Sequence, residues 1–135
     1  MFFRHPILIG ALAISVSLVT GSLAASPHQE RPAAKAERLL RCDVIGERAI
    51  EVGKTQPPTP YLNNMLQMGG ANIGMSLFER EPDMVTVAYR AAGWDVGRLE
   101  KDREALIPVV SKLGADALQA EVIQCMTYIN ALTGH

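Results

Sequence analysis

Apolar residues recur at spacings of three and four along most of the chain after residue 31, which is the period of an α-helix with one buried face. The first such segment begins at Pro32, a residue suited to the first helical turn, and ends at Gly53. A stiff, extended connector follows at KTQPPTP, because its prolines are incompatible with a helix interior. The first segment predicts an inward stripe made of Leu39, Cys42, Ile45, Ala49 and Val52.

The second helical segment starts with Thr59 as the N-cap and Pro60 at the first position, and runs to about Arg80. The third opens with Pro82 at its first position and Asp83 in its first turn, and Gly93 closes it. The inward residues expected for these two helices are Leu62, Met65, Leu66, Ile73 and Leu77, then Met84, Val87, Ala88 and Ala91.

The fourth helical segment follows Trp94, which we expect to fold back onto the core, and Asp95 is its N-cap. Pro108 should kink or divide this helix before Gly114 ends it. The last helix covers 115–134. The inward residues of the fourth helix are Leu99, Leu106, Val109, Val110 and Leu113, and those of the last are Leu118, Val122, Cys125, Met126, Ile129 and Leu132.

No long stretch alternates with period two, so the pattern predicts an all-α fold, a small bundle of about five helices. The chain has 135 residues, enough for one domain, which we place at 32–135. Residues 1–25 have the layout of a secretory signal peptide, with Arg4, an apolar run and then small residues. Cleavage after Ala24 or Ala25 is expected, and retention as a membrane anchor is the alternative. Residues 26–31 form a polar, flexible start.

Two cysteines, Cys42 and Cys125, lie on inward stripes of the first and last helices. An even number of cysteines in an exported chain favours a disulfide, and two free buried thiols are the alternative. A bond between them would tie the two ends of the domain together.

The stretch QMGGANIGMS, residues 67–76, has the G-x-x-x-x-G spacing of a phosphate-binding loop. Met75 stands where such a loop requires lysine, and the preceding residues have a helical pattern rather than that of a strand. We therefore expect a helix crossing, in which Gly70 and Gly74 on one face allow close approach. A loop that divides two shorter helices is the alternative.

The net charge and the positions of the histidines argue against nucleic-acid binding and against histidine-based catalytic or metal sites. Removing residues 1–25 takes Arg4 from the 13 basic residues and leaves 12 against 14 acidic ones, a net charge of −2 that does not favour nucleic acid. His28 and His135 lie at the ends of the mature chain, where neither could be oriented in a catalytic or metal site. We expect no catalytic residues, no cofactor and no metal.

Two groups of charged residues need an interpretation. Glu79, Glu81 and Asp83 form an acidic cluster that we assign to solvent exposure and to the start of the third helix, with a paired-carboxylate hydrolase as the alternative. The segment RLEKDRE, 98–104, mixes both signs and is typical of a solvated helix face.

A partner surface is predicted around the proline connector, because a stiff loop can be presented to a partner at a small loss of conformational entropy. Methionines near the glycines add an adaptable apolar surface that could line a groove. The function expected is that of an exported binding protein of the periplasm or cell exterior, an inhibitor or immunity-type protein whose partner is a toxin, a hydrolase or an envelope component. The alternatives are an acid or stress chaperone of the envelope and a small hydrolase. The residues expected at the partner surface are Pro57, Pro58, Pro60, Tyr61, Met65 and Met68, with Met75 beside the glycines.

Overall fold

The computed structural model describes residues 29–55 and 59–134, and in this part of the chain it shows five helices and no strand. The expected all-α fold is therefore confirmed. The segment predicted to be the signal peptide and residues 26–28 of the predicted flexible start lie outside the described residues. No helix within the described ranges is both long and apolar enough to cross a bilayer. The helices are α2 (Pro32–Thr55), α3 (Pro60–Phe78), α4 (Met84–Ala91), α5 (Val96–Ser111) and α6 (Ala115–Thr133).

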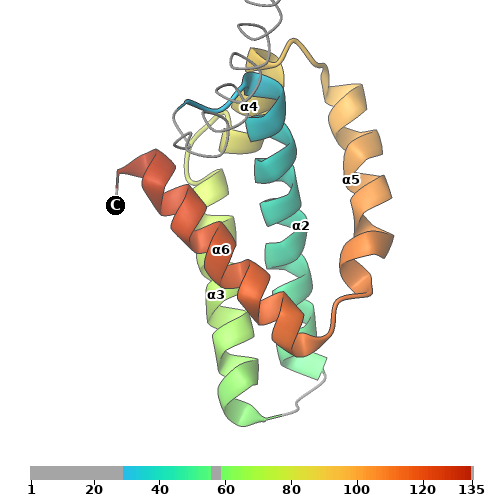
Figure 1. Cartoon of the computed structure of the whole chain (residues 1–135), viewed down its shortest axis with the longest axis vertical. Helices are drawn as coiled ribbons and strands as arrows, with labels where there is room; N and C mark the ends of the chain where they lie inside the picture. Colours follow the sequence, from blue (N-terminus) through green and yellow to red (C-terminus); the bar gives the residue numbers. More distant parts are fainter. Residues whose placement is uncertain (1–28, 56–58, 135) are drawn as a thin grey trace, which may run out of the picture. The chain divides into compact units, whose positions relative to one another are not determined.

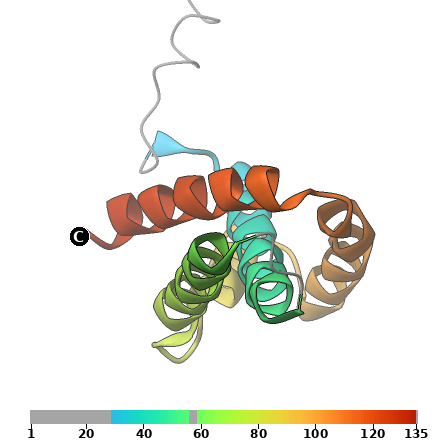
Figure 2. The same cartoon turned by 90° about the horizontal axis from the view of Figure 1, so that it is seen from below.

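Helix α2 is the central element, and α3, α4, α5 and α6 all pack against it. Helices α3 and α5 lie on opposite sides of α2, and α6 crosses α2 and α3 (Figure 1 and Figure 2). The predicted stripe of α2 is buried throughout. Leu40 and Val44 are also buried, because neighbours cover more than one side of this helix.

The helix starts follow local sequence signals. The side-chain oxygen of Thr59 accepts a hydrogen bond from the backbone N–H of Leu62 at 3.1 Å, and Asp95 Oδ1 accepts one from Arg98 at 2.8 Å. Gly93, with φ +78°, follows α4 as expected. Asp83 is the N-cap of α4 rather than part of its first turn, so this helix begins at Met84 and not at Pro82.

Gly53 does not end α2, contrary to the sequence-based expectation. The helix continues to Thr55 because Gly53 faces α3, and its carbonyl accepts a hydrogen bond from Gln67 Nε2 at 2.9 Å. A Cβ at Gly53 would lie 2.7 Å from Gln67 Cγ and 2.8 Å from the carbonyl oxygen of Asn63. This glycine therefore permits close packing of two helices and is not a stop signal.

The expected inward faces of α4 and α5 are partly wrong. In α4 the buried residues are Val85, Ala88 and Tyr89, whereas Val87 is exposed. In α5 only Val110 is fully buried, and Val109 is exposed. The buried face of α4 is therefore rotated toward Val85 and Tyr89, and Ala91 is exposed as well as Val87. Helix α5 buries little because it packs mainly against α2, with only a small contact to α4.

Pro108 lies inside α5 without dividing it, since α5 runs unbroken from Val96 to Ser111. The proline removes one backbone donor from the helix. Pro108 is exposed, so solvent can satisfy the carbonyl that loses its partner.

A disulfide joins Cys42 of α2 to Cys125 of α6, with the two Cα atoms 5.5 Å apart. This confirms the pairing expected from the inward stripes. Beside it, Arg41 donates two hydrogen bonds to the carboxylate of Glu121, at 3.0 Å from Nε and 2.6 Å from Nη2. Helices α2 and α6 are therefore held by a covalent bond and an adjacent ion pair.

The glycine stretch lies within one continuous helix, so a loop dividing two helices is excluded. Gly70 faces α2, where an added Cβ would be 2.5 Å from the carbonyl oxygen of Gly46. Gly69 faces α6, where an added Cβ would be 2.5 Å from Val122 Cγ1. Gly74 is not a crossing residue, because nothing lies within 4 Å of its Cβ position. The close contacts of α3 are therefore made by Gly69 and Gly70, and not by Gly70 and Gly74 as expected.

Candidate functional site

A cleft of about 450 Å³ lies beside α2, between residues of α3 and α5. The α2 residues Gly46 and Ile50 contribute an apolar part of its lining, and Gly70, Gly74 and Phe78 contribute the α3 side. Gly46 and Gly70 are buried where α2 and α3 cross, whereas nothing lies within 4 Å of the Cβ position of Gly74, so the α3 backbone is accessible at Gly74. Three charged residues complete the lining, Asp43 and Glu47 from α2 and Arg103 from α5.

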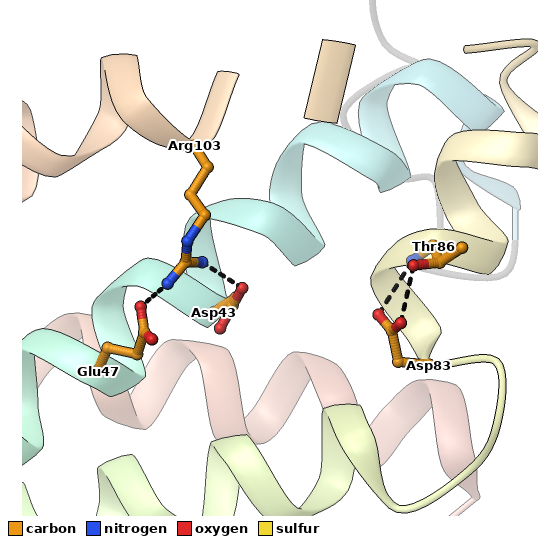
Figure 3. A network of polar contacts seen from close by, with 5 residues as sticks. All are labelled: Asp43, Glu47, Asp83, Thr86 and Arg103. Atoms are coloured by element: carbon orange, nitrogen blue, oxygen red, sulfur yellow. Dashed lines mark hydrogen bonds and ion pairs between the residues drawn. The ribbon is translucent and has the colours of Figure 1, made fainter. Parts of the chain in front are cut away.

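Arg103 connects α5 to α2 across this cleft (Figure 3). Its Nη1 donates a hydrogen bond to Asp43 Oδ2 at 2.5 Å, and its Nη2 forms an ion pair with Glu47 Oε1. Asp43 is almost fully buried, whereas the side chain of Glu47 is mostly exposed. One guanidinium therefore holds two carboxylates, and the charged end of the cleft has a net charge of −1.

Burial raises the pKa of the Asp43 carboxyl above its ordinary value, because desolvation disfavours the charged form. The positive charge and hydrogen bond of Arg103 act in the opposite direction without cancelling the effect of burial. The negative charge of Asp83 adds a smaller upward contribution. Asp83 is itself hydrogen-bonded to Thr86, at 3.1 Å from the backbone N–H and 2.7 Å from Oγ1 (Figure 3).

The raised pKa of Asp43 predicts how an Asp43→Asn substitution will behave with pH. Between the unfolded pKa of about 3.9 and the higher folded pKa, the native state binds more protons than the unfolded state. This contribution to stability is fully present below the unfolded pKa and is lost as pH rises through the folded pKa. We therefore expect the free energy of unfolding of the parent, minus that of the variant, to increase as pH falls from 7 to 4. Urea unfolding of parent and variant at several pH values measures this difference. A difference that decreases on acidification would contradict the prediction.

A second polar cluster joins α4 to α5. The hydroxyl of buried Tyr89 donates a hydrogen bond to Asp102 Oδ2 at 2.7 Å, and Arg98 Nε contacts the same oxygen at 3.3 Å. Trp94 packs edge-on against Tyr89 with ring centroids 5.3 Å apart, and the Arg98 guanidinium lies 3.6 Å from the Trp94 ring centroid. Desolvation and the bond to Asp102 raise the pKa of Tyr89, which keeps this phenol protonated.

The interpretation of residues 98–104 as a solvated face is therefore only partly correct. Arg98 and Asp102 form the expected pair, but Asp102 also binds Tyr89 and Arg103 reaches Asp43. Mixed charge on a helix is usual for solvated surfaces, so the pattern alone gave no signal for these contacts. Trp94 is partly buried against the core, as expected.

The residues predicted for a partner surface are only partly brought together. Tyr61 and Met68 are exposed on α3, and they align with Met75; we name Tyr61, Met68 and Met75 the outer stripe. Pro60 is exposed at the start of α3, and Met65 is half-buried. Pro57 and Pro58 lie outside the described residues. Sequence reasoning missed Phe78, a half-exposed aromatic residue that lines the cleft.

The acidic cluster is not assembled as a pair of catalytic carboxylates. Asp83 caps α4, and Glu79 and Glu81 are exposed. Among the residues that the structure describes, no group of three or more His, Cys, Asp or Glu side chains is placed to hold a metal ion.

We take two surfaces as candidate functional surfaces. They are the cleft of α2, α3 and α5 and the outer stripe.

Comparisons of the chain with known protein families, with curated proteins and with solved structures find no match.

Proposed function

We propose that this protein is an exported binding protein that acts by contact with another protein, as an inhibitor or immunity-type protein does. The observation that carries the proposal is the cleft beside α2, where apolar lining adjoins a cluster of charges. Half-exposed Phe78 offers an aromatic anchor, and aromatic residues dominate the binding energy of many interfaces. The disulfide is consistent with an oxidising compartment outside the cytoplasm.

The fold supports this proposal through its rigidity. A surface held by packed helices and a disulfide loses little conformational entropy when a partner binds. At Gly74 there is open space where other residues carry a side chain, so a partner can approach the backbone of α3. The exposed carboxylate of Glu47 can add a directional contact at the charged end.

The acid-chaperone alternative requires carboxylates whose protonation loosens the fold. Asp43 is the most buried carboxylate described, and its shift has the opposite sign, because its protonated form is favoured in the native state. Asp43 therefore does not supply an acid-triggered release. Contact with a specific partner at neutral pH remains the better-supported proposal.

Site-specific photo-crosslinking in the exported protein tests the proposal. A benzophenone amino acid at position 78 should yield one dominant adduct with a single protein, whereas the same group at position 109 should not. Phe78 and Val109 are matched in exposure, at 50% and 51%, but Val109 does not line the cleft.

A Gly74→Leu substitution places a side chain where nothing lies within 4 Å of the Cβ position, and it should reduce the position-78 adduct about tenfold, equivalent to ~1.4 kcal/mol of binding free energy. Equal adducts at positions 78 and 109, or many unrelated adducts at 78, would contradict the proposal.

A further inference from the structure

The three most exposed large apolar side chains in the described part of the chain lie on one line along α3. They are Tyr61, Met68 and Met75, with exposed fractions of 71%, 65% and 67%. Their spacing of seven residues is almost two helical turns, so they share one side of α3 over about 21 Å. Leu66 and Ile73, which lie two positions before the stripe methionines, are buried on the other side.

Helix α3 is also the only described helix without a charged residue. Charged groups of a partner placed against the outer stripe would lose their hydration, and α3 offers no opposite charge to compensate for that loss. The electrostatically matched occupant is therefore a neutral, apolar helix face. The outer stripe itself meets this condition, so the same surface of a second copy of this chain is a matching occupant.

We infer that the outer stripe is the contact surface of a two-fold symmetric dimer, in which α3 packs antiparallel against α3 of a second copy. A two-fold axis requires a self-complementary patch. With the axis between Ala71 and Asn72, Met68 of each copy lies opposite Met75 of the other. Both residues beside the axis are exposed, and the small side chain of Ala71 allows the helices to approach.

The ends of α3 favour the antiparallel arrangement. Glu79 and Glu81 are exposed just beyond its C-terminus. Parallel pairing would place these like charges beside their copies, which is unfavourable. Antiparallel pairing instead separates the two C-terminal ends and places Glu79 beside the second turn of the other α3, which carries no charge.

The dimer is expected to be weak, because one pair of helices forms a contact at the small end of specific interfaces. A dissociation constant on the order of 1–100 μM is the corresponding expectation. The inference goes beyond the proposed function and does not depend on it. The cleft is lined by the sides of α3 and α5 next to α2, so each copy would keep its own cleft.

Analytical ultracentrifugation of the oxidised protein over a concentration series tests the inference. The parent should change from monomer to dimer with concentration. The Met68→Lys/Met75→Lys variant should weaken the dimer at least about 100-fold, because it buries unpaired like charges at a symmetric contact. Both positions are exposed, so the fold should be retained, as far-UV circular dichroism can verify. Met68→Ala/Met75→Ala is a milder variant and should weaken the dimer in the same direction.

A charge exchange tests the register. In Met68→Lys/Met75→Glu, each lysine lies opposite a glutamate of the other copy, so this variant should dimerise far better than the double-lysine variant. The matched control is Val109→Lys/Ile123→Lys, at exposed positions off the stripe, which should dimerise like the parent.

A parent that stays monomeric throughout overturns the dimer and leaves the crosslinking result at position 78 unaffected. Dimerisation that survives the double-lysine substitution overturns the assignment to the stripe. Equal loss in the Lys/Lys and Lys/Glu variants overturns the antiparallel register.

Discussion

Replacing Cys42 and Cys125 together by alanine is expected to lower the free energy of unfolding by about 4–5 kcal/mol. The disulfide links residues separated by 83 positions, and a loop of this length strongly restricts the unfolded chain. Few other single changes in a domain of this size should cost as much, since total stability is typically ~5–15 kcal/mol. The effect comes mainly from the unfolded state, so the helical content of the folded variant should remain close to that of the parent.

Urea unfolding followed by circular dichroism measures this effect, with the slope of the transition recorded as well as its midpoint. Reduction of the parent protein should give a similar loss without any substitution. Arg41→Met is the local control, because it removes the neighbouring ion pair with Glu121 while keeping the disulfide. A double-alanine variant as stable as the parent would contradict the expected role of the bond.

Gly70→Leu is expected to destabilise the fold by about 3 kcal/mol or more, whereas Gly74→Leu on the same helix should not destabilise it. At Gly70 even a Cβ would lie 2.5 Å from a backbone oxygen of Gly46 and 2.8 Å from Ile50 Cγ1. Relief requires α2 and α3 to separate, and overpacking of this kind costs ~1–3 kcal/mol or more. At Gly74 nothing lies within 4 Å of the Cβ position, and the gain in helix propensity is worth up to about 0.8 kcal/mol.

Thermal and urea unfolding of the two variants under identical conditions provide the comparison. The substitutions introduce the same side chain four residues apart in one helix, so their difference reports the surroundings of each glycine. Similar stabilities for the two variants would show that α3 does not cross α2 closely at Gly70. A destabilised Gly74→Leu would show that the space beside this residue is filled in solution.

Several features of the fold follow from the sequence because the forces behind them act over a few residues. The N-caps Thr59 and Asp95 are bonded as expected, since a cap needs only its own side chain and the first turn of the helix. The inward stripes also placed Cys42 and Cys125 correctly, and only the structure showed that the two stripes meet. The end of α2 was misjudged because a glycine inside a tight crossing has the same local signature as one that stops a helix.

The candidate site depends on contacts between distant residues. Arg103 lies 60 residues from Asp43, and nothing in the charged segment 98–104 distinguishes this arginine from its neighbours. The roles of Gly69, Gly70 and Gly74 likewise depend on where α2 and α6 pass, which the spacing of the glycines does not specify.

The sequence by itself determined that the chain forms helices, where most of them begin, and which cysteines can pair. It also predicted the inner side of α3, where Leu62, Leu66, Ile73 and Leu77 are buried as expected. It could not determine which elements cover that side, and the tertiary structure decided that they are α2 and α6, which meet α3 at Gly70 and Gly69. The physical reason is that burial depends on which surfaces the packed neighbours cover, and that is set by the whole bundle rather than by any one segment.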